Sequence, residues 1–461
     1  MDTLDKLSIL ADAAKYDAAC TSSGVNRAPQ KGSLGMASAA GCCHSFAPDG
    51  RCITLLKVLF SNACSYDCAY CVNRRSASCE RASFTPQELA DLTVDFYKRN
   101  YIEGLFLSSG VVGTPDHTTE LMIACLRILR VQHRFRGYIH AKIIPGTAPE
   151  LIGTIGLLAD RLSVNLELPS SKSLQLLCPD KDGKAVTEPM KLIHRTRVEE
   201  ETSLLEATQN KTSTLAKYAP RQRALSEGRK LYGNAAAYTL RPRPRVSSAK
   251  RSFSPAGQST QIIIGATPES DNQILRLSQA LYERYDMKRV FFSAYMPMLD
   301  DKRLPAPDTP VPLRREHRLY QADWLMRYYA FTPDELVSPE APWLDLDVDP
   351  KLAWALAHID QFPVEIIDAP LELLLRIPGV GPVGARRIIA ARRKRPLSFE
   401  DLARLNITLK RARHFMCCQG RRDRNFPLDA ELIRKLVIED ARKSSYNKTR
   451  RAIEYSQPTL F

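Results

Sequence analysis

Short apolar runs alternate with amphipathic segments between residue 53 and about residue 297. The amphipathic segments begin with helix-start signals. TPQE at Thr85 offers an N-cap, a proline at the first helical position and a glutamate three residues after the cap, and TAPE at Thr147 repeats the pattern. The apolar runs have the length of strands. They are ITLLKVLF from Ile53, GLFLSS from Gly104, GYIHAKIIP from Gly137, RLSVNLEL from Arg161, QIIIGA from Gln261 and RVFFSAYMP from Arg289.

This order of elements predicts an α/β fold class, because strands that alternate with helices pair in parallel through right-handed crossovers. Six such units suggest an open partial TIM-type (β/α) barrel over residues 53–331, and a doubly wound sheet is the alternative. Leu313–Phe331 predicts a helix that closes the flank of the barrel. Residues 178–259 are polar, basic and weakly periodic, so we expect an insertion whose C-terminal half is mobile.

The remaining segments predict further domains. Residues 1–52 form a cysteine-containing extension that begins with an amphipathic helix. After about residue 349 the chain is helical, arginine-rich and free of strand signals, which marks a second, small all-α domain at 369–420. Residues 332–368 connect the two domains, and 421–461 form a basic helical tail.

Composition places the chain among ordinary globular proteins. It has 461 residues, of which 44% are apolar and 25% are charged. No apolar run approaches the roughly 18 residues of a membrane span, and the N-terminal segment mixes acids into its first turn, unlike a signal peptide. We therefore expect a cytoplasmic protein with no membrane partner. Its twelve cysteines would stay reduced there, which favours metal over disulfides.

The charge of the chain indicates what kind of partner it binds. The net charge is +15, and few acids accompany the basic segments. A charge run is usually a solvated helix face. Here the shortage of acids favours a polyanion partner instead. The segments are Arg241–Arg251, Ala385–Arg395 and Leu409–Phe415.

Three cysteines at C-x3-C-x2-C directly follow the first predicted strand: Cys64, Cys68 and Cys71. Their thiolates can hold three irons of a [4Fe-4S] cluster, which leaves the fourth iron open for a substrate or cofactor. The loop position puts the cluster at the C-terminal mouth of the barrel, where barrel enzymes do their chemistry. A zinc site without its fourth ligand, or three scattered core cysteines, are the alternatives.

This motif, with Tyr70 between the second and third cysteines, resembles that of the radical SAM superfamily. The resemblance implies that the open iron binds the amino and carboxylate groups of S-adenosylmethionine (SAM). One electron from the cluster then cleaves the sulfonium, and the resulting 5′-deoxyadenosyl radical abstracts hydrogen from the substrate. The resemblance also implies a partial barrel of the radical SAM kind and an electron donor such as flavodoxin or ferredoxin.

Further cofactor-binding residues follow from the same resemblance. Ser109 and Gly110 end the second strand and match the element that grips the SAM amino group, although Val111 stands where the family has a glutamate. Gly265 matches the fifth-strand element beside the adenine.

In the fourth strand, Asn165 and Glu167 match inward polar groups that bind the SAM ribose or carboxylate. The alternative is that these polar side chains line the barrel interior without binding SAM. The opposite face of that strand would hold Val164, Leu166 and Leu168.

Four more cysteines lie upstream of the motif, partly in the loop AAGCCHSFAPDGRC. They could ligate an auxiliary cluster or be buried thiols, and free cysteine is among the most buried residue types. These residues are Cys20, Cys42, Cys43 and Cys52.

Leu374–Arg395 resembles the helix-hairpin-helix DNA-binding module. The first helix ends at Ile377, a hairpin of four residues follows, and Pro382 sits in the first turn of the next helix. Glycines in such a hairpin let backbone N–H groups approach a phosphate at a helix N-terminus. The implied DNA-binding residues are Gly379, Val380, Gly381, Arg386 and Arg387.

A second, degenerate copy follows in SFEDLARL, NIT and LKRARHF, and a tandem pair would grip both strands of a duplex without reading its bases. A small packing domain with an arginine-rich face is the alternative. The iron–sulfur DNA glycosylases are excluded, because Val383 stands where their catalytic lysine would be. Of their four cluster cysteines downstream of the hairpin, the chain has only Cys417 and Cys418.

A radical SAM barrel joined to this module resembles the putative DNA modification/repair radical SAM proteins. That resemblance implies base repair or modification in DNA and a possible partner similar to uracil-DNA glycosylase. The same chemistry on structured RNA, or a DNA-bound redox sensor without catalysis, stay open.

The chain ends in QPTLF, in which Gln457, Leu460 and Phe461 resemble the peptide by which bacterial repair proteins bind the sliding clamp. The alternative is a tail that folds back on its own domain or frays.

Overall fold

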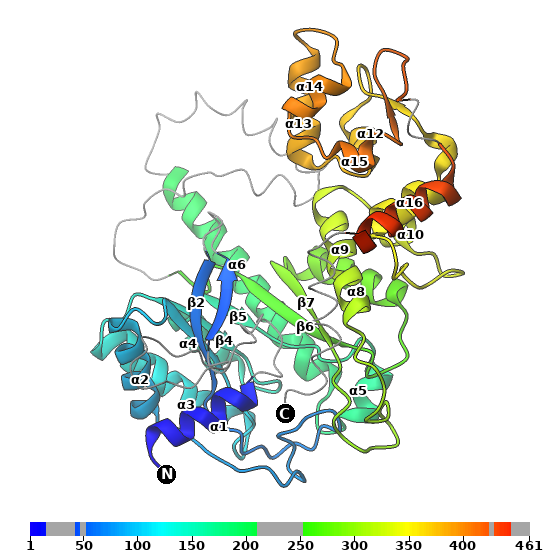
Figure 1. Cartoon of the computed structure of the whole chain (residues 1–461). Coiled ribbons are helices and arrows are strands. Elements are labelled where there is room, and N and C mark those ends of the chain that lie inside the picture. The colour runs from blue at the N-terminus through cyan, green and yellow to red at the C-terminus, as the bar shows by residue number, and fades with distance from the viewer. Residues whose placement is uncertain (15–41, 47–51, 210–251, 424–427, 444–461) are drawn as a thin grey trace, which may run out of the picture. The chain divides into compact units, whose positions relative to one another are not determined.

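The structure is a computed structural model that describes residues 1–14, 42–46, 52–209, 252–423 and 428–443 (Figure 1). These residues form two compact units. The first holds the sheet and most of the described chain up to Glu316. The second holds the described residues from His317 onward, together with Ser270–Arg276.

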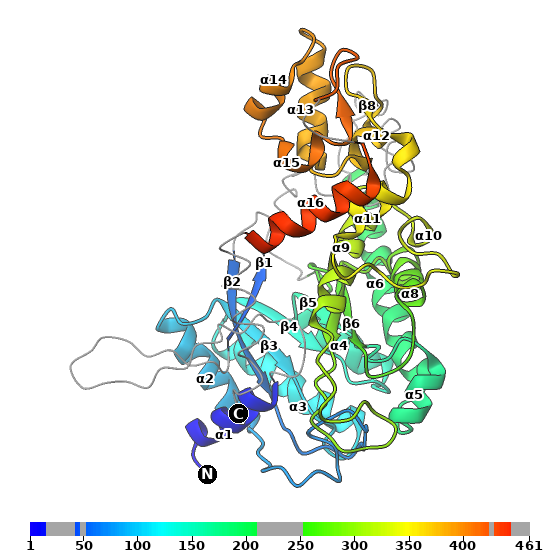
Figure 2. The ribbon, with the colours of Figure 1, turned by 45° about the vertical axis from the view of Figure 1, so that its right-hand side comes forward.

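The first unit is built on a seven-stranded sheet in the order β1 to β7. Six strands run parallel and pair in sequence order, and they curl into a partial barrel that confirms the predicted fold class (Figures 1 and 2). Branched and aromatic side chains fill these strands, so Leu56, Leu107 and Val290 are fully buried. The parallel strands are β2 (Cys52–Leu59), β3 (Gly104–Ser108), β4 (Tyr138–Lys142), β5 (Arg161–Ser163), β6 (Gln258–Ile264) and β7 (Arg289–Ala294).

The cysteine-rich segment upstream of the motif was expected to be a loop, and this is wrong for part of it. Residues Cys42–Phe46 form β1, which pairs antiparallel with β2, Cys42 opposite Leu56. The pairing covers an edge of β2 that would otherwise expose unpaired backbone groups. Cys20 lies outside the described residues, and the structure describes only the backbone of Cys43 and Cys52.

Helices connect the strands, and two of their N-termini can be compared with the N-caps predicted from the sequence. Thr85 closes a capping box, because its Oγ1 accepts from the Glu88 N–H at 3.2 Å while Glu88 accepts from the Thr85 N–H at 2.7 Å. The cap expected at Thr147 is wrong: the N-cap is Ala148, and the Thr147 hydroxyl donates to the Ile144 carbonyl at 2.7 Å. The helices are α1 (Thr3–Ala14), α2 (Pro86–Lys98), α3 (Pro115–Arg127), α4 (Pro149–Leu158), α5 (Ser171–Leu177), α6 (Gly183–Gln209) and α8 (Asp271–Tyr285).

Helix α6 occupies much of the range in which we expected an irregular insertion. Val186, Met190 and Ile193 are buried at helical spacing, but the charged residues between them dilute that period in the sequence. Residues 210–251 of the expected insertion lie outside the described residues, and its last two residues, Gln258 and Ser259, already belong to β6.

The second unit packs short helices around Leu352, Ile388 and Phe415. The expected absence of strands is wrong, because Val364–Glu365 (β8) pairs with Met416–Cys417 (β9). Among the described residues, no helix is long and apolar enough to cross a membrane. The helices are α9 (Leu313–Tyr328, which begins in the first unit), α10 (Pro333–Leu336), α11 (Pro350–Ala357), α12 (Leu371–Arg376), α13 (Pro382–Arg392), α14 (Phe399–Arg404), α15 (Leu409–Ala412) and α16 (Ala430–Lys443).

Candidate metal centre

The three motif cysteines lie on one loop directly after β2, at the carboxyl ends of the parallel strands. Backbone hydrogen bonds fasten this loop on two sides. The Ser65 N–H donates to the Val111 carbonyl at 2.8 Å, beyond β3, and the Ala69 N–H donates to the Leu177 carbonyl at 2.7 Å, at the end of α5. A third bond, from the Cys71 N–H to the Cys68 carbonyl at 2.9 Å, shapes the loop itself.

Gly110 lets the end of β3 approach the cysteine loop closely. A Cβ built on Gly110 would lie 3.0 Å from the Ala63 carbonyl oxygen and 3.2 Å from the Cβ of Cys64. The next residue, Val111, donates its backbone N–H to the Cys64 sulfur at 3.3 Å. Such a bond stabilises a thiolate and tunes an iron–sulfur ligand. Sequence reasoning missed this donor, because any non-proline residue can supply an N–H.

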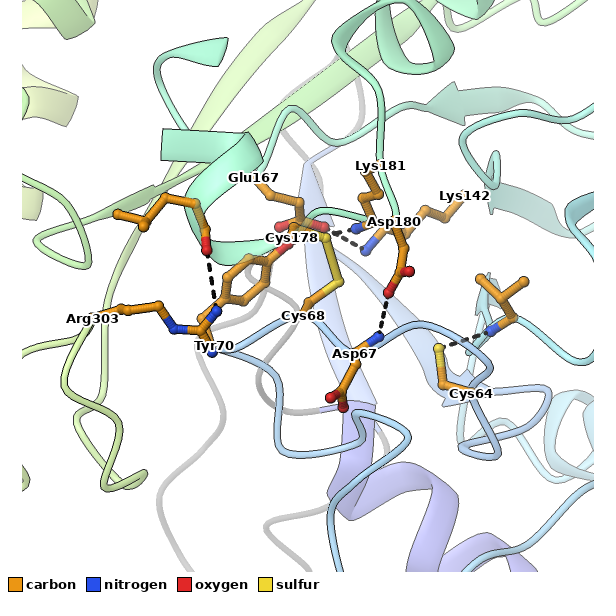
Figure 3. The surroundings of a disulfide bond; sticks show 12 residues. Cys64, Asp67, Cys68, Tyr70, Lys142, Glu167, Cys178, Asp180, Lys181 and Arg303 are labelled. Carbon is orange, nitrogen blue, oxygen red and sulfur yellow. Dashed lines mark hydrogen bonds and ion pairs between the residues drawn. A yellow bond between two sulfur atoms is a disulfide. The ribbon is translucent and has the colours of Figure 1, made fainter. Parts of the chain in front are cut away.

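Cys68 forms a disulfide with Cys178, which caps the C-terminal end of α5 (Figure 3). The two residues are 110 positions apart in sequence, and Cys178 belongs to no spacing motif, so the sequence carried no signal for this contact. Cys64 and Cys71 are free thiols. Burial raises the pKa of the Cys71 thiol.

Helix α5 is held in place from its other end by Glu269. One carboxylate oxygen of Glu269 accepts hydrogen bonds from the Ser170 hydroxyl at 2.5 Å and from the Ser173 hydroxyl. Burial opposes ionisation, but these hydroxyls lower the pKa of Glu269 overall. Because Ser170 is also the N-cap of α5, this contact fixes the helix that carries Cys178.

The residues fit a [4Fe-4S] cluster in their loop position, in the close approach of Gly110 and in the N–H aimed at Cys64. Among the described residues, no group of three or more His, Cys, Asp or Glu could hold a single metal ion. A cluster makes a different demand, since each thiolate binds its own iron. Cys68 can serve as a ligand only after its bond to Cys178 is reduced.

Charged and polar side chains surround the cysteine loop (Figure 3). The Tyr70 hydroxyl accepts from the Lys181 ammonium at 3.5 Å. Glu167 pairs with Lys142 at 3.3 Å, and both Glu167 and Lys181 lie close enough to Cys71 to influence its pKa, in opposite directions. Of the predicted cofactor-binding residues, Tyr70, Gly110 and Glu167 are therefore gathered at the cysteine loop.

The predicted alternation along the fourth parallel strand is wrong beyond Ser163, where β5 ends. Glu167 has a φ of 63°, in the left-handed region, which breaks a two-residue period. Its backbone rejoins the sheet through bonds with β6, from the Glu167 N–H to the Gln261 carbonyl at 3.0 Å. Asn165 is buried and donates to the Gln261 side chain at 3.2 Å, while Leu166 is only half-buried.

The other two predicted cofactor contacts are placed differently. The Ser109 hydroxyl donates to the adjacent Gly110 carbonyl at 2.7 Å. Gly265 has a φ of 86° and lines a pocket of about 100 Å³ with Tyr295 and Pro312. The Tyr295 hydroxyl is buried without a hydrogen-bond partner among the described residues, and burial raises its pKa. Sequence reasoning treated Tyr295 only as part of a strand.

Comparison with known proteins gave a match to one family model and matches to solved structures. Residues 58–205 match the sequence model of the Radical SAM superfamily. A crystal structure of HydG, a maturase of the [FeFe]-hydrogenase, aligns with 59% of this chain and 49% of its own at 10% identity and a TM-score of 0.37. The HydG structure from Carboxydothermus hydrogenoformans aligns with 59% of this chain and 51% of its own at 11% identity and a TM-score of 0.38.

The chain thus spans about half the length of those two structures. No curated protein matches it. The family match covers β3, β4, β5 and the whole cysteine loop. The chain therefore contains a radical SAM domain, an enzyme domain of the kind that uses a [4Fe-4S] cluster and SAM.

Proposed function

We propose that this enzyme repairs or modifies bases in DNA. The cluster and SAM, when bound, supply a 5′-deoxyadenosyl radical that abstracts hydrogen from the substrate. The residues described above would hold them: Cys64, Cys68 and Cys71 the cluster, with Tyr70, Ser109, Gly110, Asn165, Glu167 and Gly265 as the proposed SAM contacts. The DNA substrate rests on the second unit.

The observation that carries the proposal is a repeated helix–turn–helix backbone in the second unit. Gly379, between α12 and α13, has a φ of 90°, and Asn406, between α14 and α15, has a φ of 59°. The residue after each is a buried branched one, Val380 or Ile407. The same conformation at matching positions supports a tandem helix-hairpin-helix module.

The two turns pack against each other through Gly379. A Cβ there would lie 2.6 Å from the Thr408 carbonyl oxygen, so the contact requires glycine. The Val380 contact to DNA expected from the sequence is not supported, because the Val380 side chain is buried and its N–H donates to the Ile377 carbonyl at 3.1 Å. Gly381, at the N-terminus of α13, is the better candidate for a backbone phosphate contact.

Exposed cations flank this turn. Arg386 and Arg387 are exposed on α13, and Arg387 also donates to the Leu405 carbonyl of the second turn at 3.1 Å. In contrast, Arg392 is used structurally, since it donates to the Ile366 and Ala369 carbonyls, both at 2.8 Å. Exposed arginines beside a helix N-terminus suit a phosphate backbone.

Other partners remain part of this proposal. The reduction of the cluster requires an electron donor such as flavodoxin or ferredoxin. The clamp-binding peptide Gln457–Phe461 lies outside the described residues, and its deletion should abolish clamp binding without changing SAM cleavage. A protein similar to uracil-DNA glycosylase is the proposed functional partner.

The test is anaerobic reconstitution of the cluster followed by measurement of 5′-deoxyadenosine with no nucleic acid, with duplex DNA and with structured RNA. We expect DNA to raise the yield most, and Cys71→Ala to give none. A larger stimulation by RNA would transfer the proposal to RNA. An intact cluster that never cleaves SAM would indicate a redox sensor and contradict an enzymatic role on DNA.

A further inference from the structure

An aromatic pair lies on α9 in the second unit, with its tryptophan exposed and its tyrosine half-buried. Trp324 is 53% exposed, and its ring centroid lies 4.1 Å from that of Tyr328, with the two planes tilted by 40°. The guanidinium carbon of Arg327 lies 5.2 Å from the Tyr328 ring centroid. Large exposed aromatic surface is costly to leave in water, and its presence points to a binding partner.

A chain of contacts links this pair to the turn before α13. The Trp324 indole is hydrogen-bonded to the Tyr329 hydroxyl, and an indole N–H can only donate. The Tyr329 hydroxyl oxygen would lie 3.2 Å from a Cβ built on Gly381. The Lys351 Nζ lies 4.7 Å from the Tyr329 ring centroid and donates to the Val380 carbonyl at 2.6 Å. The exposed indole is therefore only two contacts from Gly381.

The segment that directly follows these two rings is fastened to α12. Arg376 donates to the Tyr329 carbonyl at 2.9 Å and to Glu335 at 2.6 Å. Its guanidinium carbon also lies 3.7 Å from the centroid of the Phe331 ring. Ring surfaces held in place before binding lose little conformational entropy when a ligand stacks on them.

Resting on the proposed function, we propose that Trp324 and Tyr328 form a stacking platform for an unpaired nucleobase of the strand whose phosphate contacts Gly381. Aromatic faces stack bases regardless of sequence, and Arg327 adds a cation–π contribution. The exposed charge on α13 favours a nucleic acid over a protein as the occupant. Enzymes that act on a base in a duplex must take it out of the stack, and its former partner is then an unpaired base that this platform would hold.

The experiment compares two exposed tryptophans of the second unit. Trp343 is 54% exposed, which matches Trp324, so Trp343→Ala controls for the loss of an exposed indole. The full-length protein is titrated into two fluorescently labelled DNA duplexes, one fully paired and one with a single bulged nucleotide, and anisotropy gives both Kd values.

We expect Trp324→Ala to weaken binding of the bulged duplex about 10-fold and of the paired duplex less than about 2-fold. Trp324→Phe should retain most of the affinity and covers the case in which the alanine variant fails to fold. Trp343→Ala should bind both duplexes like the wild type.

The outcomes separate this inference from the proposed function. If Trp324→Ala binds the bulged duplex normally while an Arg386→Ala/Arg387→Ala variant binds both duplexes weakly, the platform is wrong and the DNA proposal stands. An equal loss on both duplexes would also overturn the platform. If the wild type binds neither duplex, the DNA proposal itself fails.

A second observation, independent of nucleic acid, concerns Cys178. Its disulfide occupies Cys68, and one sulfur cannot be both in a disulfide and a ligand to iron. We infer that the Cys68–Cys178 bond is a redox lock on cluster assembly. Hydrogen peroxide closes it: two thiols give up two electrons and two protons, the S–S bond forms, and peroxide is reduced to two waters. A dithiol reductant opens it by thiol–disulfide exchange and becomes a disulfide itself.

The test uses the cluster-free protein and a readout other than activity. After treatment with hydrogen peroxide, alkylation and peptide mass spectrometry should detect the Cys68–Cys178 crosslink. Iron and sulfide supplied without a dithiol should then load the wild type poorly, whereas Cys178→Ser should take up about four irons per chain. Adding dithiothreitol should bring the wild type to the same level.

Cys79→Ser is the control, since Cys79 is a free, half-buried thiol in the same part of the chain. It should behave like the wild type. Absence of the crosslinked peptide would overturn the lock. So would a Cys178→Ser protein that binds less iron than the fully reduced wild type, because Cys178 would then be a ligand.

Discussion

Two loops of this molecule contrast in what their residues contribute. The loop from Asn62 to Arg74 in the first unit acts through side chains, three thiols on a backbone that β3 and α5 hold in place. The turn from Ile377 to Pro382 in the second unit would, as proposed, contact a phosphate through its backbone, and its Val380 side chain is buried. A side-chain site should lose its function when a ligand side chain is replaced, but it should tolerate some changes in the surrounding backbone. A backbone site should tolerate changes of its side chains, but it should be sensitive to substitutions that add bulk or disfavour the local φ.

The largest expected effect comes from removing a thiol of the first loop. Cys64→Ala, Cys68→Ala or Cys71→Ala should each abolish SAM cleavage and lose cluster iron, because each thiolate is expected to hold one iron. Iron analysis and the 5′-deoxyadenosine yield measure this. Cys417→Ala should do neither, since Cys417 lies on β9 in the second unit. A triple variant that still cleaves SAM would contradict the cluster assignment.

Sequence spacing could predict this loop because its ligands are close together in the chain and follow a strand. The six parallel strands and the glycine turn were also predictable, because each is specified by residues that are close together in the sequence. Long-range contacts were not: Cys178 reaches Cys68 across 110 residues, and Lys351 reaches the Val380 carbonyl from another helix. The positive φ of Glu167 was also missed, since none of the residues around it in the sequence requires that conformation.

The second expected effect tests the backbone turn. Gly379→Ala should destabilise the protein by about 3 kcal/mol, because a Cβ meets both an unfavourable φ and the Thr408 carbonyl. Gly420→Ala is the matched control: its φ is 69° with nothing within 4 Å of a Cβ, so it should cost about 1 kcal/mol. Urea unfolding measures both. Equal losses would mean that space at the turn contributes nothing.

A smaller effect is expected from the charges beside the turn. The double variant Arg386→Ala/Arg387→Ala should weaken duplex binding about 10-fold at moderate salt, similarly for all sequences. Each lost phosphate contact should also reduce the slope of log K against log salt by about 1. Anisotropy titrations at several salt concentrations measure both quantities. Loss of a strong sequence preference would instead indicate base readout and break the contrast between the loops.

The smallest effect concerns Lys351, whose side chain donates a hydrogen bond to the Val380 carbonyl and so helps to hold the backbone of the turn in place. Burial lowers the pKa of Lys351 to about 7, Asp349 opposes this shift and Arg376 adds to it. Between that value and the ordinary 10.5, the unfolded chain holds a proton on this lysine that the folded chain lacks. Stability should therefore rise with pH across this interval and level off above it.

The rise attributable to this one group is about 1 kcal/mol between pH 7 and pH 8. Lys351→Met should remove that part of the slope, while both proteins should respond alike to pH below 7, where the lysine is protonated in both states. Urea unfolding at pH 6, 7 and 8 for the two proteins gives the difference. An identical pH dependence would mean that Lys351 keeps its proton in the fold. The Val380 carbonyl would then be held by an ammonium ion throughout, and the turn would be charged from beneath as well as from its exposed face.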